Sequence, residues 1–485
     1  MPRIPETTDA QSTFLRALRT SMLSYDEALM ASILRQRVSR CIAVFFVLTA
    51  LVSAGSAAEP TSWDQVPAIL ARIKAPVFPN RDFSILDFGA KPDGVSDCTD
   101  AFRKAIAAAS AAGGGRVVVP AGTWLSGAIH LKSNVDLHLA EGATIKFSTD
   151  AKQYLPAVFT RFECIEVMNY SALVYAFEQE NIAVTGKGTL DGQANNSNWW
   201  AWTKPARGDV ADLENMGNAD VPVAQRVFGD GHFLRPNLLQ TVRCKNVLVE
   251  GITIKSSPMW TIHPLYCTNV TVRGVTVVGS GPNTDGCDPD SCADVLIENC
   301  TFNTGDDCIA VKSGRDRDGH RVNIPCQNII IRGCTMKNGH GGITCGSETA
   351  GDIRNVFAED CILDSPDLNM AIRLKTSSER GGVIEDVFIR NCTIRRAGVA
   401  GIHMTLKYSK GPGPYTPAIR RIDIRNCKFS NVPKAIVIEG LSESAKITDI
   451  TMQDCTFDNV ASPNAISNAD NVRLINVKVD GKAME

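Results

Sequence analysis

Four short segments of this chain combine carboxylates, an imidazole and cations in a way that could support chemistry. They are Asn283-Thr284-Asp285, Gly305-Asp306-Asp307, Gly339-His340-Gly341 and Arg373-Leu374-Lys375. Carboxylates and imidazoles are the groups that proteins use most often for general acid and base catalysis. Arginine and lysine can hold an anionic partner. The segments therefore predict acid and base chemistry on an acidic molecule, provided that the fold brings them together.

A strand-like phrase, an aliphatic or β-branched triplet followed by a turn residue, recurs through the second half of the chain. Successive copies start at Val270, Val295, Ile329, Val356, Val387, Ile422, Ile450 and Val472, which are separated by 22 to 35 residues. Self-similarity at this period is typical of solenoids. Because the apolar residues alternate with period two and lie between Asn, Asp and Gly turn signals, helical repeats are disfavoured. The sequence predicts an all-β fold, a single-stranded right-handed parallel β-helix.

Cysteine occupies the same place in six successive copies of the phrase, at Cys300, Cys334, Cys361, Cys392, Cys427 and Cys455. Buried cysteine behaves as a small hydrophobic residue, so these six are expected to stack as an internal column. A disulfide framework is the alternative, since the chain has 16 cysteines and a leader typical of export. Cys287 with Cys292, or Cys308 with Cys326, could form local bridges, and the sequence leaves this pairing open.

The repeat also supplies a register with which to test the four segments. When Ile309, Ile343 and Ile372 are taken as position zero, Asp306 and His340 both fall at minus three. Arg373 then falls at plus one, and Lys375 at plus three together with Lys312. Odd positions of a strand point to the same face, so these side chains are expected to face outward together.

Asp285 and Asp307 both fall at minus two, counted from Cys287 and from Ile309. Strict alternation would turn them inward, so they are expected to lie where a turn breaks the alternation. Matched positions on neighbouring turns lie about 5 Å apart. Three carboxylates at that spacing cannot all ionise at ordinary pH, and at least one pKa must rise. Turn capping or calcium binding is the alternative role for an isolated Asp-Asp pair.

The N-terminal region resembles a leader for export. A basic stretch at residues 35–40 precedes an apolar run at 41–52 and small residues at 53–58. The apolar run is short for a membrane span, so no stable span is expected in the mature chain. We predict an N-terminal extension and signal peptide over residues 1–58, with translation starting at Met30, and a β-helix domain over residues 59–485. The expected location is periplasmic or extracellular.

Two segments interrupt the strand pattern. Residues 101–112 follow Asp97-Cys98-Thr99-Asp100 and end at Gly113-Gly114-Gly115, which predicts an amphipathic helix that caps the N-terminal end of the coil. Residues 191–235 form a long insertion that contains Trp199, Trp200 and Trp202. The insertion could form a wall beside the binding face, or its tryptophans could only pack against the coil.

Composition and charge narrow the class of partner. The chain has 44% hydrophobic and 6% aromatic residues, which fits a long core of valine and isoleucine. Its formal net charge is −2, and no strongly basic face is evident, so a nucleic-acid partner is not expected. We expect a monomer that needs no metal or other cofactor.

The ordered segments Asn-Thr-Asp, Gly-Asp-Asp, Gly-His-Gly and Arg-x-Lys resemble those of the polygalacturonases of glycoside hydrolase family 28. The resemblance extends from about residue 82 to the C-terminus, and three phrases are similar to bacterial exo-acting members: residues 87–90, 188–192 and 260–264. Leu374 stands where the family usually has isoleucine. The family fold is a right-handed parallel β-helix, which agrees with the repeat.

The resemblance implies a role for each residue. Asp306 would be the general acid, Asp285 and Asp307 would position and deprotonate water, and His340 would hold the hydrogen-bonding state of the acid. Arg373 and Lys375 would bind a galacturonate carboxylate of homogalacturonan. His263 and Tyr408 are further candidates for binding sugar, although a histidine next to Trp260 could equally be a buried core residue.

The resemblance further implies inverting hydrolysis of α-1,4 linkages between galacturonates. The insertion and the bacterial phrases favour cleavage from the non-reducing end. A β-helix polysaccharide lyase, which would need Ca²⁺ and a strong base, and a carbohydrate-binding solenoid without activity are the alternatives. The sequence does not decide whether methyl-esterified or branched pectins are accepted.

Overall fold

The computed structural model describes residues 62–409, 411–462 and 464–484. These residues belong to one compact unit that begins at Thr61. The predicted signal peptide over residues 1–58 and the start at Met30 lie outside the described residues. Within the described part of the chain, no helix is both long and apolar enough to cross a membrane.

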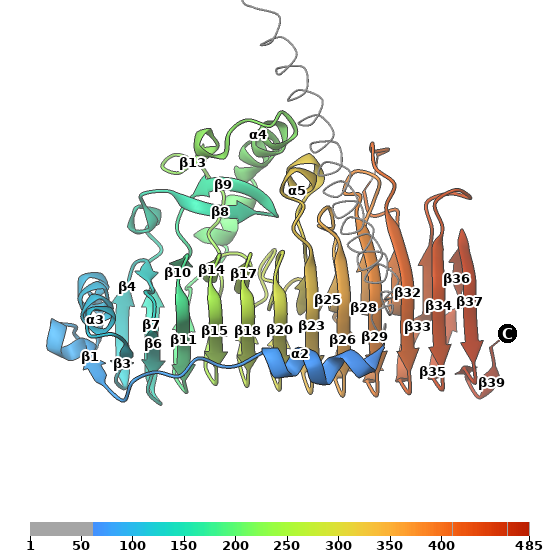
Figure 1. Ribbon diagram of the computed structural model, residues 1–485, viewed down its shortest axis with the longest axis horizontal. Coiled ribbons are helices and arrows are strands. Elements are labelled where there is room, and N and C mark those ends of the chain that lie inside the picture. Colours follow the sequence, from blue (N-terminus) through green and yellow to red (C-terminus); the bar gives the residue numbers. More distant parts are fainter. Residues whose placement is uncertain (1–61, 410, 463, 485) are drawn as a thin grey trace, which may run out of the picture. The chain divides into compact units, whose positions relative to one another are not determined.

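The unit is a right-handed parallel β-helix, as the repeat predicted (Figure 1). Its first sheet has 13 parallel strands. In spatial order they are β1 (Asp82–Ser84), β3 (Gly115–Val119), β6 (Val135–Leu139), β11 (Glu180–Gly186), β15 (Lys245–Glu250), β18 (Thr268–Arg273), β20 (Ala293–Glu298), β23 (Cys326–Arg332), β26 (Ile353–Glu359), β29 (Val383–Arg390), β32 (Ala418–Arg425), β34 (Ile447–Gln453) and β37 (Ala469–Ile475).

A second stack of strands follows the first sheet along the chain in each turn. Its members are β2 (Asp93–Asp97), β4 (Gly122–Ser126), β7 (Ala143–Phe147), β12 (Thr189–Asp191), β16 (Thr253–Lys255), β19 (Thr276–Val278), β21 (Thr301–Asn303), β24 (Thr335–Met336), β27 (Ile362–Asp364), β30 (Thr393–Arg396), β33 (Lys428–Glu439), β35 (Thr456–Ser462) and β38 (Lys478–Val479). The short β39 (Lys482–Ala483) folds back antiparallel on β38.

A third stack carries the functional segments. It contains β5 (Ile129–His130), β10 (Val174–Phe177), β14 (Leu239–Val242), β17 (Ile262–Leu265), β22 (Ile309–Val311), β25 (Gly339–Cys345), β28 (Leu368–Lys375), β31 (Ala400–Thr405), the end of β33 and β36 (Ala465–Ser467). Single bridges through Cys287 connect β17 to β22. Most turns therefore supply one strand to each of three stacks, and the turn that contains Cys287 joins the third stack through single bridges.

Asparagine and aspartate mark the turns because they tolerate a left-handed backbone. Asn246, Asn269 and Asn328 have φ of 58°, 57° and 59°. The side chains also link neighbouring turns, since Asn269 Nδ2 donates to Asn246 Oδ1 at 2.6 Å. The turn residues that helped to define the repeat therefore also hold its register.

The cysteines are buried and unbridged, as expected for an internal column. All fifteen cysteines of the described residues are buried and unbonded to one another, including the six repeat cysteines. The alternative pairs Cys287 with Cys292 and Cys308 with Cys326 form no bridge in this structure. Cys244, Cys267 and Cys292 form a second short column, in which the Cys267 backbone N–H lies 3.3 Å from Cys292 Sγ.

Two helices cover open surfaces of the coil. The predicted cap is present as α3 (Thr99–Ala111), which buries Phe102 and Ile106 against the first turns. The sequence analysis did not predict α2 (Val66–Arg72), which follows the 3₁₀ turn η1 (Trp63–Gln65). Val66 and Ile69 of α2 pack on Phe357 and other outward apolar residues of the first sheet (Figure 1).

The coil is interrupted between β12 and β14 by η4 (Trp199–Thr203), α4 (Ala206–Asn218), η5 (Val223–Gln225) and β13 (Val227–Phe228). An antiparallel hairpin of β8 (Val158–Phe162) and β9 (Ile165–Asn169) pairs with β13, and α4 contacts α5 (Asp316–Val322) (Figure 1). The remaining 3₁₀ turns are η2 (Ile85–Phe88) and η3 (Ala151–Tyr154). Trp199 is buried in the core, whereas Trp200 lines a surface pocket, so the tryptophans serve both expected roles.

The packing of the cysteines makes a prediction about reduction. Because the column is held by burial and not by covalent bonds, dithiothreitol should leave the thermal unfolding midpoint unchanged. Thiol titration of the denatured chain should find fifteen free cysteines over the described residues. Native disulfides would instead cost about 2–4 kcal/mol on reduction, and a fall in the midpoint of several degrees would contradict the column.

Candidate active site

The strand register that the sequence predicted is present in the structure. Cys287 bridges to Ile309, Ile309 pairs with Ile343, and Ile343 pairs with Ile372. The four segments therefore lie within four residues of matched positions on four neighbouring turns, three of them before the matched residue and the Arg-x-Lys segment after it. They come together where the second stack turns into the third.

The three carboxylates of these segments form one cluster. Asp285, Asp306 and Asp307 each present an oxygen within 4.8 Å of an oxygen of the other two. Asp306 is the most accessible, with 17% of its side chain exposed, compared with 3% for Asp285 and 1% for Asp307. A ligand on the surface can therefore contact Asp306, whereas the carboxylates of Asp285 and Asp307 are almost fully covered.

Each carboxylate of the cluster lies within 4 Å of a basic side chain. His340 Nδ1 lies 2.8 Å from Asp306 Oδ1, and Lys375 Nζ lies 2.8 Å from Asp307 Oδ2. Lys312 Nζ lies 3.9 Å from Asp285 Oδ2. Lys312, which the register singled out as a further cation, is therefore part of the site. The nearby positive charges compensate for the crowding of three acids in a buried place.

Burial raises the pKa of Asp285 well above its ordinary value, and the charges of Asp288 and Asp306 raise it further. Burial also raises the pKa of Asp306, but the hydrogen bond to His340 and the charge of Lys375 outweigh this and lower it. The same hydrogen bond raises the pKa of His340. These shifts favour the neutral form of Asp285 and an ion pair between Asp306 and His340 in the free protein.

The two cations of the Arg-x-Lys segment contact the cluster directly. Besides the Lys375 contact, Arg373 Nη1 lies 3.3 Å from Asp307 Oδ1. Tyr408 is 42% exposed, and its ring centre lies 5.0 Å from Lys375 Nζ and 5.8 Å from the Arg373 guanidinium carbon. Arg373, Lys375 and Tyr408 thus form one edge of the site, in which the largely buried cations contact Asp307 and the Tyr408 ring is exposed.

His263 lies outside this group. Its side chain is fully buried, and its Nδ1 accepts hydrogen bonds of 2.8 Å from Asn237 and Gln240. Its Nε2 lies 3.5 Å from Asp290 Oδ2, and Asp290 is paired with the buried Arg161 at 2.6 Å. The structure therefore offers a sugar no access to His263, and the ring is a packed core residue.

Two acids that the sequence analysis overlooked lie behind the cluster. Asp288 is fully buried, and neither of its carboxylate oxygens has a hydrogen-bond partner. Burial raises its pKa well above the ordinary value. Glu348 accepts a hydrogen bond of 3.0 Å from Lys312. The register could have indicated Asp288. It lies one residue after Cys287, just as Arg373 lies one residue after the matched Ile372.

The end of the insertion holds the Asn-Thr-Asp segment in place. Arg235 is 3% exposed, and its guanidinium donates to Asn283 Oδ1 and to the Pro282 carbonyl, both at 2.7 Å. Burial lowers the pKa of Arg235 to about 10. The insertion is therefore coupled to the turn that carries Asp285.

A cavity of about 570 Å³ adjoins the cluster on the side of His340. Its lining includes Trp200 of the insertion, Gly305, His340 and Pro366. The carboxylate oxygens are close enough to ligate a metal ion, but the three cationic partners oppose a divalent cation at the same place. The arrangement suits proton transfer to and from a bound ligand.

Comparison with known proteins agrees with this chemistry. The model of glycosyl hydrolases family 28 matches residues 230–479, and that of rhamnogalacturonase A/epimerase, pectate lyase-like, matches residues 83–154. A probable polygalacturonase of Vitis vinifera is 31% identical over 394 residues, covering 77% of this chain and 74% of the relative. An exo-poly-alpha-D-galacturonosidase of Dickeya chrysanthemi is 26% identical over 438 residues, covering 81% and 70%.

Among solved structures, a hyperthermoactive exopolygalacturonase from Thermotoga maritima superimposes with a TM-score of 0.84 and 41% identity. The match covers 87% of this chain and 97% of that structure. The chain therefore belongs to glycosyl hydrolases family 28 and is a glycosidase built on a right-handed parallel β-helix.

Proposed function

We propose that this glycosidase hydrolyses the α-1,4 linkages between galacturonates in polygalacturonate, and that it acts from the non-reducing end. The observation that carries the proposal is the cluster of Asp285, Asp306 and Asp307, in which each acid lies within 4 Å of a basic side chain. Such a cluster can supply an acid and a base while Arg373 and Lys375 attract the carboxylates of the substrate. The names of the relatives support the choice of substrate.

Asp306 is the proposed general acid because it is the most accessible acid of the cluster. Its pKa is lowered in the free protein, so the proton that it donates comes from the hydrogen bond with His340. When substrate displaces water, a neutral pair of carboxylic acid and imidazole becomes favoured over an ion pair, because a low dielectric disfavours separated charge. Asp306 then protonates the leaving glycosidic oxygen.

Asp307 and Asp285 are the proposed pair that hold the attacking water. Burial raises the pKa of Asp285 and so favours its neutral form, and we therefore assign Asp307 as the base and Asp285 as the residue that orients the water. The distance of at most 4.8 Å between oxygens of the cluster is shorter than the roughly 6.5–9.5 Å usual for inverting enzymes. Inversion is nevertheless the proposal, because the burial of Asp285 and Asp307 hinders either from touching the anomeric carbon directly.

Action from one end is supported by the insertion and by the relatives described as exo-acting. Trp200 contributes to the wall of the cavity beside His340, and Arg315 joins Glu163 of the hairpin and Glu214 of α4 to the coil. The insertion therefore borders the cavity, and ion pairs join both the insertion and the hairpin to the coil. Export and a monomeric state stay predictions, as the leader at residues 35–58 lies outside the described residues.

Asp306→Asn should lower kcat by about 10²- to 10⁴-fold on polygalacturonate, because the amide cannot donate a proton to the leaving oxygen. Reducing-end release under substrate saturation measures this. Asp423→Asn, on the outer side of β32 and paired with Arg425, is the matched control and should retain full activity. Full turnover by Asp306→Asn would instead favour a carbohydrate-binding solenoid or different chemistry.

Early products of polygalacturonate should be galacturonate or its dimer alone, and proton NMR should show the β-anomer first. Chromatography at low conversion, combined with rapid NMR, measures both properties on one sample. A mixed ladder of oligomers would refute end-on cleavage, and initial α-anomer would make a buried aspartate the nucleophile. An unsaturated product that disappears with chelator would indicate a lyase.

His340→Gln should move the alkaline limb of the kcat/KM profile to lower pH and reduce the maximum by about 10²-fold. The pKa of His340 is raised, so its proton is present below that pKa and lost above it. In wild type the alkaline limb should therefore lie above the ordinary imidazole value of about 6.5. His138→Gln, on the first sheet, is the control, and an unmoved limb in His340→Gln would disprove the shared proton.

A further inference from the structure

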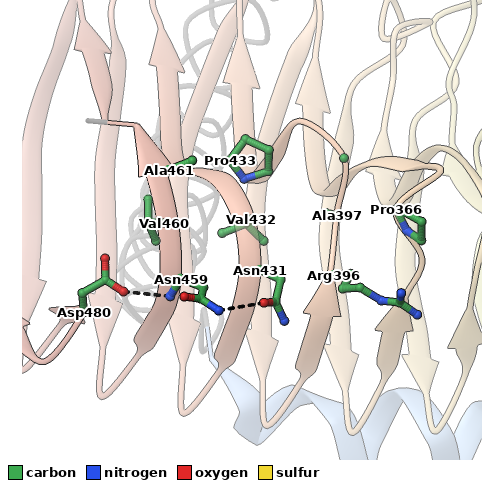
Figure 2. A pocket seen from close by; sticks show the side chains of 11 residues that line it. Pro366, Arg396, Ala397, Asn431, Val432, Pro433, Asn459, Val460, Ala461 and Asp480 are labelled. Atoms are coloured by element: carbon green, nitrogen blue, oxygen red, sulfur yellow. Dashed lines mark hydrogen bonds between the residues drawn. The ribbon is translucent and has the colours of Figure 1, made fainter.

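A groove continues from the cavity beside His340 toward the C-terminal turns. Pro366 lines that cavity and also a second one, of about 570 Å³, which reaches Asp480. Figure 2 shows residues of the second cavity on successive turns of the coil, with Asn431 and Asn459 between Arg396 and Asp480. The shared residue places the two cavities side by side.

The groove is long enough for several sugar residues. From the turn of His340 it passes β24, β27, β30, β33, β35 and β38, each of which pairs with the next. Five steps at about 4.8 Å each give a length of about 24 Å. A polymer held at the catalytic cluster could therefore lie along these turns.

The far part of the groove differs in charge from the catalytic cluster. Its described lining includes Val432, Pro433 and Val460, and Arg396 is its single cation. Arg396 Nε already donates to Asp364 at 2.8 Å. A galacturonate carboxylate placed here would have to share Arg396 with Asp364 and would meet the carboxylate of Asp480 in the same lining, which is unfavourable.

The same lining suits an uncharged sugar with an apolar substituent. Asn459 Nδ2 donates to Asn431 Oδ1 at 3.0 Å (Figure 2). Asn431 Nδ2 donates to the Arg395 carbonyl at 3.0 Å. Each amide keeps a second N–H that can reach a hydroxyl or an ester carbonyl. The valines and the proline can contact a methyl group.

We propose that this groove binds methyl-esterified galacturonate residues of the chain whose free non-reducing end occupies the catalytic cluster. The inference rests on the proposed function and adds a substrate class to it. The enzyme would require free carboxylates on the sugars that contact Arg373 and Lys375. It would favour methyl esters on the sugars that lie in the groove. Partly esterified pectin with a free end would then be a better ligand than fully de-esterified polygalacturonate.

Binding to the inactive full-length Asp306→Asn variant tests the proposal. The probes are two octagalacturonates with free acids at the first two residues from the non-reducing end, the other six being either methyl esters or free acids. Calorimetry should show the esterified probe binding about tenfold more tightly, and Ala461→Trp, which fills the groove, should remove this difference. Digalacturonate should bind equally to Asp306→Asn and to the double variant that also carries Ala461→Trp.

Arg473→Trp, at an exposed position on β37 in the first sheet, controls for a bulky surface residue and should keep the preference. Equal or tighter binding of the fully acidic probe overturns the proposal, as does a preference that survives in Ala461→Trp. If a neutral galactan oligomer competes for the groove as well as the esterified probe does, the proposal is also overturned, and the groove would be a site for neutral side branches of the polysaccharide. If digalacturonate does not bind and the wild type leaves polygalacturonate intact, the proposed function itself fails.

Discussion

The register between neighbouring turns is the constraint on which the rest of this structure depends. Cys287, Ile309, Ile343 and Ile372 point into the core at equivalent places, and their burial aligns the residues on either side of them. A slip of one residue would move buried side chains to the surface, so the apolar core specifies the alignment strongly. The catalytic geometry is thus a by-product of core packing: residues more than sixty positions apart, such as Asp307 and Lys375, meet because the strands beneath them pair.

Charge balance is the second requirement, and the coil meets it by taking acids and cations from different turns. Asp285, Asp306 and Asp307 come from two neighbouring turns, while Lys312, His340 and Lys375 come from the ends or beginnings of three successive strands. The three acids are affected differently by their surroundings, so they can take different roles in proton transfer. Burial raises the pKa of Asp285, while the hydrogen bond to His340 overcomes burial and lowers that of Asp306. These shifts favour a neutral Asp285 and an ion pair between the accessible Asp306 and His340, so the cluster holds groups that can donate protons and groups that can accept them.

The sequence predicted the features that follow from period-two patterning: the solenoid, the capping helix near residues 101–112, the cysteine column and the grouping of four segments. It predicted less well what depends on long-range packing. Nothing local in Trp63 or Val66 indicates that they lie on Phe357. For His263 the sequence left a sugar-binding role and a buried core position equally open, and contacts with Asn237 and Asp290 hold it in the core. Asp288 was missed although its register position was available, because a buried carboxylate without partners is not expected from strand alternation.

The most direct test of the account is the ionisation of His340 measured by NMR titration of imidazole nitrogens, in the wild type and in Asp306→Asn. If neighbouring turns place the two side chains in contact, the pKa of His340 lies above the ordinary value of about 6.5 in the wild type. It should then fall toward or below that value when the charge of residue 306 is removed. An ordinary pKa that is the same in both proteins would contradict the account, because it would mean that the turns do not bring these residues together.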